Sequence, residues 1–242
     1  MARRGRRGGG APRPEQPLRA LVGGPLRRAA FFDMDRTLVR VNTARLWAAW
    51  QRRHGRARRR ELAVVLWWLA RYSLGAIDVP TLARSVVRRM KGRVEDDFAT
   101  EVARWVEAEV LREISDAARA AVRAHQQAGD VTALLSATTI YAGRTVAAEV
   151  GIEHVLASRF TVRDGRFTGE VEGPLIYGDG KVSAAEAWAL AEGVDLSRSV
   201  FYTDSISDLP MLERVGVPHV VNPDPRLRWV ARRRGWPVST WR

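Results

Sequence analysis

Ala29-Ala-Phe-Phe-Asp-Met-Asp-Arg-Thr-Leu38 is the most informative stretch of this 242-residue chain. An apolar run leads into Asp33, which predicts a buried strand that ends in polar residues. Side chains alternate across a strand, so Asp33, Asp35 and Thr37 point the same way if the extended backbone continues. Two crowded carboxylates repel each other unless a cation lies between them or one carries a proton. The stretch therefore indicates a magnesium site with a general acid. The alternative is an acidic loop without function, since Asp-x-Asp also occurs by chance.

Composition limits the classes of protein to which the chain can belong. Its length suits one domain with a sizeable insertion, and 46% apolar residues are enough for a core. The chain has no cysteine, which excludes disulfides and a thiol nucleophile. The four histidines have no spacing typical of metal ligands. No secretory signal peptide is expected, and we expect a cytoplasmic protein.

The charge of +13 is concentrated near the N-terminus. Residues 1–60 hold 17 arginines and three acids, whereas residues 61–242 hold 23 basic residues and 24 acids. A nucleic-acid-binding surface over the whole fold is therefore not supported. Residues 1–28, rich in Gly, Pro and Arg, predict a disordered basic tail. The tail could make weak contact with an anionic membrane or RNA, or be only a solubilising extension, and no obligate protein partner is indicated.

The segment 42–114 has helical spacing of its apolar residues. Within it, the run 52–60 is rich in arginine, and Leu62–Ile77 is strongly apolar. This apolar run has 16 residues and is interrupted by Arg71, so it is shorter than the roughly 20 residues needed to cross a bilayer. We expect a small helical bundle; a helix lying on a membrane surface is the alternative.

From residue 115 the pattern changes to strands that alternate with helices. Strands are predicted at Val131–Leu135, Ser199–Thr203 and His219–Val221, and Asp164-Gly165 predicts the turn of a hairpin over 160–171. Alternating strands and helices imply an α/β fold with a parallel sheet, in which ligands bind beyond the carboxyl ends of the strands.

The polar clusters of the chain follow the predicted strands, so they should meet at one edge of the sheet. The residues expected there are Asp33, Asp35, Thr37, Ser136, Lys181, Asp204 and Asp208. Carboxylates without His or Cys select a hard cation such as Mg²⁺. A hydroxyl and an ammonium beside that cation suit a phosphoryl group. Lys181 is one of only two lysines among 40 basic residues, which indicates a position that needs a compact ammonium.

In their order and spacing, these pieces resemble the four motifs of the haloacid dehalogenase (HAD) superfamily of hydrolases. The motifs are Asp33-Met-Asp-Arg-Thr37, Ser136, Lys181 and Asp204-Ser-Ile-Ser-Asp208. The last motif is similar to that of subfamily IB, the phosphoserine-phosphatase-like branch. The resemblance implies a Rossmann-like parallel-sheet core over 29–41 and 115–242, with helices on both faces. It also implies that 42–114 is an all-helical C1-type cap.

The resemblance implies a catalytic role for each aspartate of the first motif. Asp33 would be the nucleophile that forms an aspartyl-phosphate. Asp35 would protonate the leaving oxygen and then accept a proton from the hydrolytic water. Asp33, the backbone carbonyl of Asp35, and Asp204 would hold Mg²⁺.

The remaining motif residues would serve the phosphoryl group of the substrate. Thr37, Ser136 and Lys181 would bind its oxygens. Asp208 would orient Lys181 or the water molecules on the metal. Together these roles imply a magnesium-dependent phosphatase that acts on a small phosphorylated metabolite.

Two departures from the family pattern affect the expected substrate. Arg36 occupies a position where the family often has glycine, and Asn42 stands where phosphoserine phosphatases proper have a glutamate that reads the substrate amine. Phosphoserine is therefore not the expected substrate. Two alternative functions are a phosphatase of a lipid phosphate at the membrane surface and a non-catalytic RNA-binding scaffold.

Overall fold

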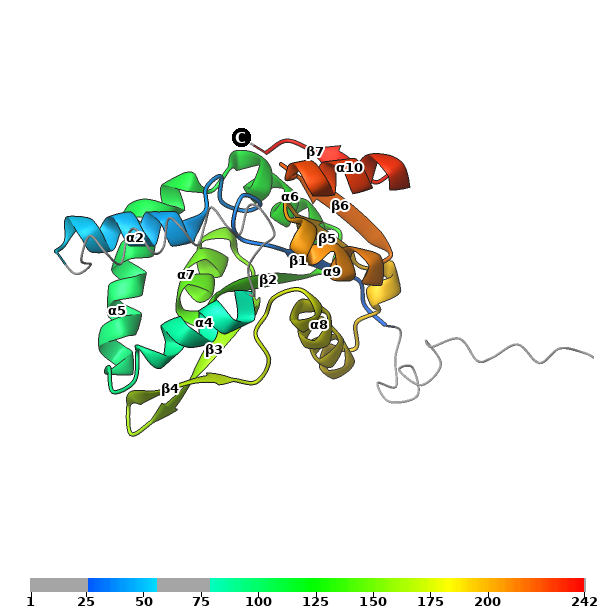
Figure 1. Ribbon diagram of the computed structural model, residues 1–242. Helices are drawn as coiled ribbons and strands as arrows, with labels where there is room; N and C mark the ends of the chain where they lie inside the picture. The colour runs from blue at the N-terminus through cyan, green and yellow to red at the C-terminus, as the bar shows by residue number, and fades with distance from the viewer. Residues whose placement is uncertain (1–25, 56–78, 242) are drawn as a thin grey trace, which may run out of the picture.

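A seven-stranded sheet forms the centre of the molecule in a computed structural model, which describes residues 26–55 and 79–241 (Figure 1). The strand order is β4-β3-β2-β1-β5-β6-β7, and every neighbouring pair is parallel except β3 and β4. The strands are β1 (Ala29–Phe32), β2 (Val131–Thr139), β3 (His154–Arg163), β4 (Arg166–Glu172), β5 (Val200–Thr203), β6 (Val217–Val221) and β7 (Val238–Ser239). The predicted α/β class is therefore confirmed.

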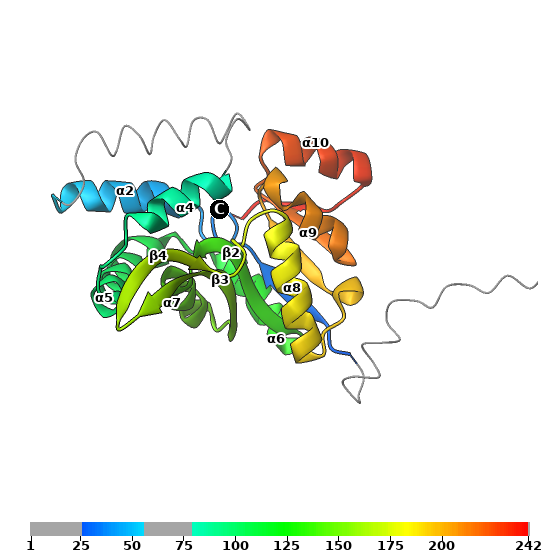
Figure 2. The same cartoon turned by 60° about the horizontal axis from the view of Figure 1, so that its bottom comes forward.

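Helices cover both faces of the sheet (Figures 1 and 2). They are α6 (Asp116–Gln127), α7 (Ile140–Val150), α8 (Asp179–Glu192), α9 (Leu209–Arg214) and α10 (Pro225–Arg234). The alternation of side chains along β1 supplies one core on each face. Phe32 packs with buried residues of α6 and α7, whereas Phe31 packs with those of α8, α9 and α10. The buried strand before Asp33 is thus fully apolar because both of its faces are covered.

Within the described residues between β1 and α6 the α-helices are α2 (Thr43–Arg53), α4 (Val79–Arg88) and α5 (Glu95–Trp105), which we call the inserted helices. Near the end of the helical segment predicted over 42–114, α5 does not continue as a regular α-helix. The α-helix ends at Trp105 and continues as a π-helical turn, Val106–Val110, and a 3₁₀ turn, Leu111–Glu113. In the π-helical turn the Leu111 N–H donates to the Val106 carbonyl, five residues back. Val106 and Val110, at the two ends of this turn, are both buried.

The β3–β4 hairpin connects the core with the inserted helices. Its turn, Asp164-Gly165, has φ angles of 51° and 70°, which confirms the predicted turn. Three backbone hydrogen bonds join residues 92–95 to residues 165–167: Gly92 N to Phe167 O at 2.8 Å, Phe167 N to Arg93 O at 3.0 Å, and Glu95 N to Gly165 O at 2.9 Å. We call these three bonds the hairpin ladder. The inserted helices are therefore attached to the core at a third place, besides the two chain connections.

Several boundaries differ from the sequence predictions, among them the end of β2 and the start of β6. β3 begins at His154, before the hairpin predicted over 160–171. Its first half pairs in parallel with β2, and the predicted hairpin did not include this half. β7 has only two residues, too few for a periodic pattern. The predicted tail 1–28 is wrong at its end, because Leu26 is buried and Arg28 binds Asp130 through two hydrogen bonds of 2.8 and 2.5 Å.

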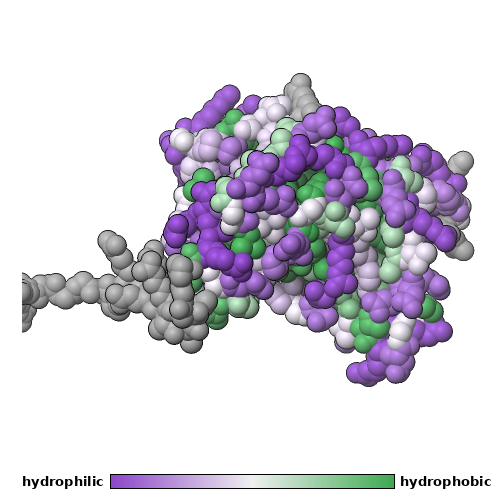
Figure 3. Space-filling view, turned by 180° about the vertical axis from the view of Figure 1, so that it is seen from behind, coloured by the Kyte–Doolittle hydropathy of each residue, from purple (hydrophilic) through white to green (hydrophobic). Residues whose placement is uncertain are grey.

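Several other predictions fall on residues that the structure does not describe. These are the tail up to residue 25, the arginines of 56–60 and the apolar run Leu62–Ile77. Among the described helices, none is long and apolar enough to span a bilayer. Seen from behind, the surface has hydrophobic side chains in its middle and hydrophilic ones around them (Figure 3). That face is mixed in character rather than uniformly polar.

Candidate functional site

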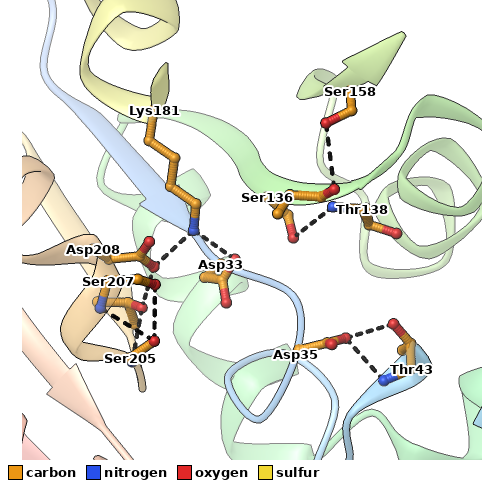
Figure 4. A network of polar contacts seen from close by, with 12 residues as sticks. Asp33, Asp35, Thr43, Ser136, Thr138, Ser158, Lys181, Ser205, Ser207 and Asp208 are labelled. Atoms are coloured by element: carbon orange, nitrogen blue, oxygen red, sulfur yellow. Dashed lines mark hydrogen bonds and ion pairs between the residues drawn. The ribbon is translucent and has the colours of Figure 1, made fainter. Parts of the chain in front are cut away.

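Lys181 lies at the centre of a buried ion-pair cluster at the carboxyl edge of the sheet (Figure 4). Its Nζ donates to Asp33 Oδ1 at 2.8 Å and to Asp208 Oδ2 at 2.7 Å. Asp33 follows β1 directly, Lys181 lies in the first turn of α8, and Asp208 precedes α9. All three side chains are less than 10% exposed. The structure therefore brings together three of the predicted site residues from distant parts of the chain.

Asp208 fixes the position of Lys181. Its Oδ2 also accepts a hydrogen bond of 2.6 Å from Thr203 Oγ1, at the end of β5. The two carboxylates raise the pKa of Lys181 above its ordinary value, against the effect of burial. Lys181 is therefore a permanent ammonium ion. Thr203 was not predicted as a site residue, although a hydroxyl just before Asp204 on the edge of the sheet could have suggested it.

Asp35 lies apart from this cluster and is bound by the first residues of α2 (Figure 4). Thr43 donates to Asp35 Oδ1 from its hydroxyl at 2.6 Å and from its backbone N–H at 3.2 Å. Asn42, the N-cap of α2, donates to Asp35 Oδ2 at 3.0 Å. Burial raises the pKa of Asp35 to about 6, and the hydrogen bonds from Thr43 limit that rise.

Neither Asn42 nor Thr43 was predicted to contact the site. Asn-Thr before a helical segment is a capping signal, and it places both residues at the start of α2. The sequence did not reveal that the same two residues would also bind Asp35. The position of this carboxylate therefore depends on where α2 begins.

Asp204 is the carboxylate that most needs a cation. It is 6% exposed, and its side chain makes no hydrogen bond or ion pair within 26–55 and 79–241. Burial raises the pKa of Asp204 to about 8, and the charges of Asp33 and Asp208 add to the rise. Burial also raises the pKa of Asp33, which the Lys181 ammonium opposes. Two buried carboxylates without enough positive charge fit a hard cation that prefers oxygen ligands.

A cation at this place would need more than side chains to complete its ligands. Among the described residues, no three His, Cys, Asp or Glu side chains converge to form a metal cage. Asp33 and Asp204 would therefore share the ion with backbone oxygens and water, which is the ordinary pattern for Mg²⁺. The oxygen donors present suit Mg²⁺ and not a metal that prefers sulfur or imidazole.

The loop that carries Asp204 is held by the start of α10. The Asp224 backbone N–H donates to the Asp204 carbonyl at 2.9 Å, and Asp224 Oδ2 accepts from the Ile206 N–H at 2.7 Å. Asp224 also caps α10 through the N–H groups of Arg226 and Leu227. One aspartate thus joins a helix N-terminus to the site loop, a role that was not predicted.

Ser136 and Thr37 are the two predicted hydroxyl groups. Both are buried, at 4% and 1% exposure. Ser136 lies inside β2, not after it as predicted, at the point where the pairing with β3 shifts register. Its Oγ accepts from the Thr138 N–H at 3.5 Å. Thr37 Oγ1 has no hydrogen-bond partner among the residues that the structure describes, which is costly for a buried hydroxyl.

Arg36 lies between Asp35 and Thr37 on the loop that follows β1. Its backbone is left-handed, with φ of 54°. Its carbonyl accepts a hydrogen bond of 2.8 Å from Asn222 Nδ2. The guanidinium is exposed, and its charge opposes the rise in the pKa of Asp35 and of Asp204. The left-handed conformation explains why glycine suits this position.

Comparison with known proteins agrees with this geometry. The sequence model of the haloacid dehalogenase-like hydrolases matches residues 30–213. Phosphoserine phosphatase SerB1 of Mycobacterium tuberculosis is 31% identical over 221 residues, which cover 90% of this chain and 72% of that protein. The histidinol-phosphatase of Neisseria meningitidis is 28% identical over 222 residues, which cover 90% of this chain and all of that protein.

A solved structure has the same fold. The crystal structure of a protein of unknown function from Bordetella pertussis Tohama I superposes with a TM-score of 0.80 at 32% identity. The match covers 88% of this chain and 98% of that one. The family model spans most of the chain and includes all the residues of the buried cluster. The chain therefore belongs to the haloacid dehalogenase-like hydrolases.

Proposed function

We propose that this protein is a magnesium-dependent phosphatase that hydrolyses a small phosphomonoester through an aspartyl-phosphate on Asp33. The observation that carries the proposal is the ion-pair cluster, in which Lys181 binds Asp33 and Asp208 at the open edge of the sheet. A nucleophilic carboxylate must approach a dianionic phosphoryl group, so fixed positive charge beside it is the main requirement. Lys181 provides that charge and holds one oxygen of Asp33.

The reaction proceeds in two displacements at phosphorus. In the first, an Asp33 oxygen bonds to phosphorus while the bond to the leaving oxygen breaks and Asp35 donates its proton to that oxygen. In the second, water attacks phosphorus, Asp35 takes the proton back, and the bond to Asp33 breaks. A pKa of about 6 suits this exchange, because both forms of Asp35 are accessible near neutral pH.

Binding of the phosphoryl group would use the remaining site residues. Lys181, Ser136 and Thr37 would contact its oxygens, and the unpaired Thr37 hydroxyl would then have a partner. Asp33, Asp204 and the Asp35 carbonyl would hold Mg²⁺, which when bound supplies positive charge to the reacting phosphoryl group. Asp208 would keep Lys181 in place.

The inserted helices would form a cap over the site, with boundaries at about 42 and 114, and would select a small phosphorylated metabolite. The relatives named as phosphoserine phosphatase and histidinol-phosphatase support a small phosphomonoester. Asn42 caps α2 and binds Asp35, so it is not available to read a substrate amine. The lipid-phosphate and RNA-scaffold alternatives rest mainly on residues 1–25 and 56–78, and no described feature favours either.

Replacement of the nucleophile tests the proposal. Asp33→Asn should lower magnesium-dependent phosphate release from p-nitrophenyl phosphate by several orders of magnitude, because the amide is a poor nucleophile. Asp164→Asn, in the exposed hairpin turn, is the matched control and should keep the wild-type rate. Equal turnover by the Asp33→Asn protein would refute the mechanism.

A further inference from the structure

Arg36 and Asn222 form a pair of backbone outliers beside the site. Three non-glycine residues in the described ranges have a left-handed backbone: Arg36 at 54°, Asn222 at 44°, and Asp164 in the hairpin turn. A left-handed conformation costs roughly 1 kcal/mol or more for a residue with a Cβ atom. Such outliers persist where the surrounding structure enforces them, and they gather at functional sites. The two outliers outside the turn are joined by a hydrogen bond, in which Asn222 Nδ2 donates to the Arg36 carbonyl at 2.8 Å.

The C-terminal segment holds Asn222 in this position. Asn222 Nδ2 also donates to the Trp241 carbonyl at 3.0 Å, and Oδ1 accepts from the Trp241 N–H at 3.0 Å. Its backbone N–H donates to the Ser239 carbonyl at 3.0 Å. Trp241 itself is buried. The Arg36 carbonyl is therefore bonded to a residue 186 positions away, and the C-terminal segment holds that residue in place.

The side chain of Arg36 has no carboxylate partner among the described residues, whereas that of Lys181 has two. The Nζ of Lys181 is bound by Asp33 and Asp208. Arg36 is exposed and makes no ion pair with any residue that the structure describes. Arg36 stands between Asp35 and Thr37, so its side chain starts from the same loop as these two site residues. Its charge also opposes the rise in the pKa of Asp35 and of Asp204. The guanidinium thus lies within electrostatic range of the reacting end of the site.

We propose that Arg36 determines substrate specificity by binding a second oxyanion on the leaving group of the phosphomonoester, and that Asn222 is a positioning residue for it. The proposal rests on the proposed phosphatase function. Asp33, Asp35 and Asp204 make this end of the site negative, so a second substrate anion would be repelled unless a cation met it. A guanidinium presents two parallel N–H groups that match an oxyanion. The preferred substrate is therefore a phosphorylated acid, such as a phosphomonoester that carries a carboxylate.

A matched pair of substrates tests this specificity. 3-Phosphoglycerate carries a carboxylate where glycerol 3-phosphate carries a hydroxymethyl group. We expect the wild-type protein to favour 3-phosphoglycerate in kcat/KM. The ratio of the two kcat/KM values should fall by about 10- to 100-fold in Arg36→Gly, which suits the left-handed backbone, and less in Arg36→Lys. Asn222→Gly keeps the left-handed backbone but loses the side-chain amide, and its ratio should be intermediate.

Two results would overturn the proposal: a wild-type ratio near one, or the same ratio in the wild-type and Arg36→Gly proteins. Failure of the proposed function gives a different result, since p-nitrophenyl phosphate and both metabolites would then resist hydrolysis. Calorimetric binding to the Asp33→Asn protein does not depend on turnover. There, 3-phosphoglycerate should bind about 10-fold or more tightly than glycerol 3-phosphate, and adding Arg36→Gly should remove the difference. An unchanged difference would refute the assignment of Arg36.

Discussion

The hydroxyl of Thr43 is a sensitive test of the acid–base role of Asp35. Thr43→Val keeps the shape of the side chain and the backbone N–H, but removes the 2.6 Å hydrogen bond to Asp35 Oδ1. A hydrogen bond to a charged group is worth about 1.5–3 kcal/mol, and 1.36 kcal/mol corresponds to one pH unit. Because this bond favours the carboxylate, its loss should raise the pKa of Asp35 by about 1 to 2 pH units from its wild-type value of about 6.

The pH dependence of kcat/KM measures this change. Asp35 must be protonated to donate to the leaving oxygen, so activity should decline as the pH rises through its pKa. In Thr43→Val the decline in kcat/KM should move to higher pH by about 1 to 2 pH units, the same amount as the rise in the pKa of Asp35. Thr43→Ser retains the hydroxyl and should behave like the wild-type protein. A decline that stays at the same pH in Thr43→Val, or that moves equally in Thr43→Ser, would refute the role of this hydrogen bond.

Two further predictions concern the buried charges. Lys181→Met leaves Asp33 and Asp208 without their common counter-charge, so thermal unfolding should show a loss of about 3–5 kcal/mol and phosphate release should stop. Adding Asp208→Asn should restore part of the stability but no activity; full stability of Lys181→Met alone would contradict this. For the metal-free protein, burial raises the pKa of Asp204 to about 8 from an ordinary value of 3.8, so the native state binds this proton more tightly than the unfolded state. Stability should therefore fall as the pH rises from about 4 to about 8, by at most about 6 kcal/mol, and Mg²⁺ should raise the melting temperature more at pH 8 than at pH 5; a melting temperature that does not depend on pH or Mg²⁺ would count against it.

Sequence patterns were sufficient for the central strands β1, β2, β5 and β6 and for the buried cluster, for a physical reason. Each parallel strand is short and apolar, and each ends in polar residues at the same edge. The prediction that Asp33, Lys181 and Asp208 converge needed only the order of strands and helices. Their ion pairs at 2.8 and 2.7 Å confirm that convergence.

The sequence did not predict contacts that depend on how separate elements lie in space. Thr43 binds Asp35 because α2 begins beside the first motif, and no periodicity indicates that placement. Asn222 and Arg36 lie in loops 186 positions apart and both have a left-handed backbone, and no sequence pattern indicates that these two loops meet. β3 was predicted only in part, because one strand pairs in parallel with β2 and antiparallel with β4.

The hairpin ladder between residues 92–95 and 165–167 affects how the inserted helices can be exchanged. A cap joined to its core by two chain connections could be replaced as a cassette cut at those two points. In this protein, removal of such a cassette would break the hairpin ladder. The backbone groups of Gly165 and Phe167, which stay with the core, would then lose their hydrogen-bond partners. Removing the cassette would also break the edge-to-face contact between Phe98 and Phe167, whose ring centroids are 5.5 Å apart. A functional chimaera with a relative should therefore transfer β3 and β4 together with the inserted helices, so that two stretches of sequence are exchanged as one unit.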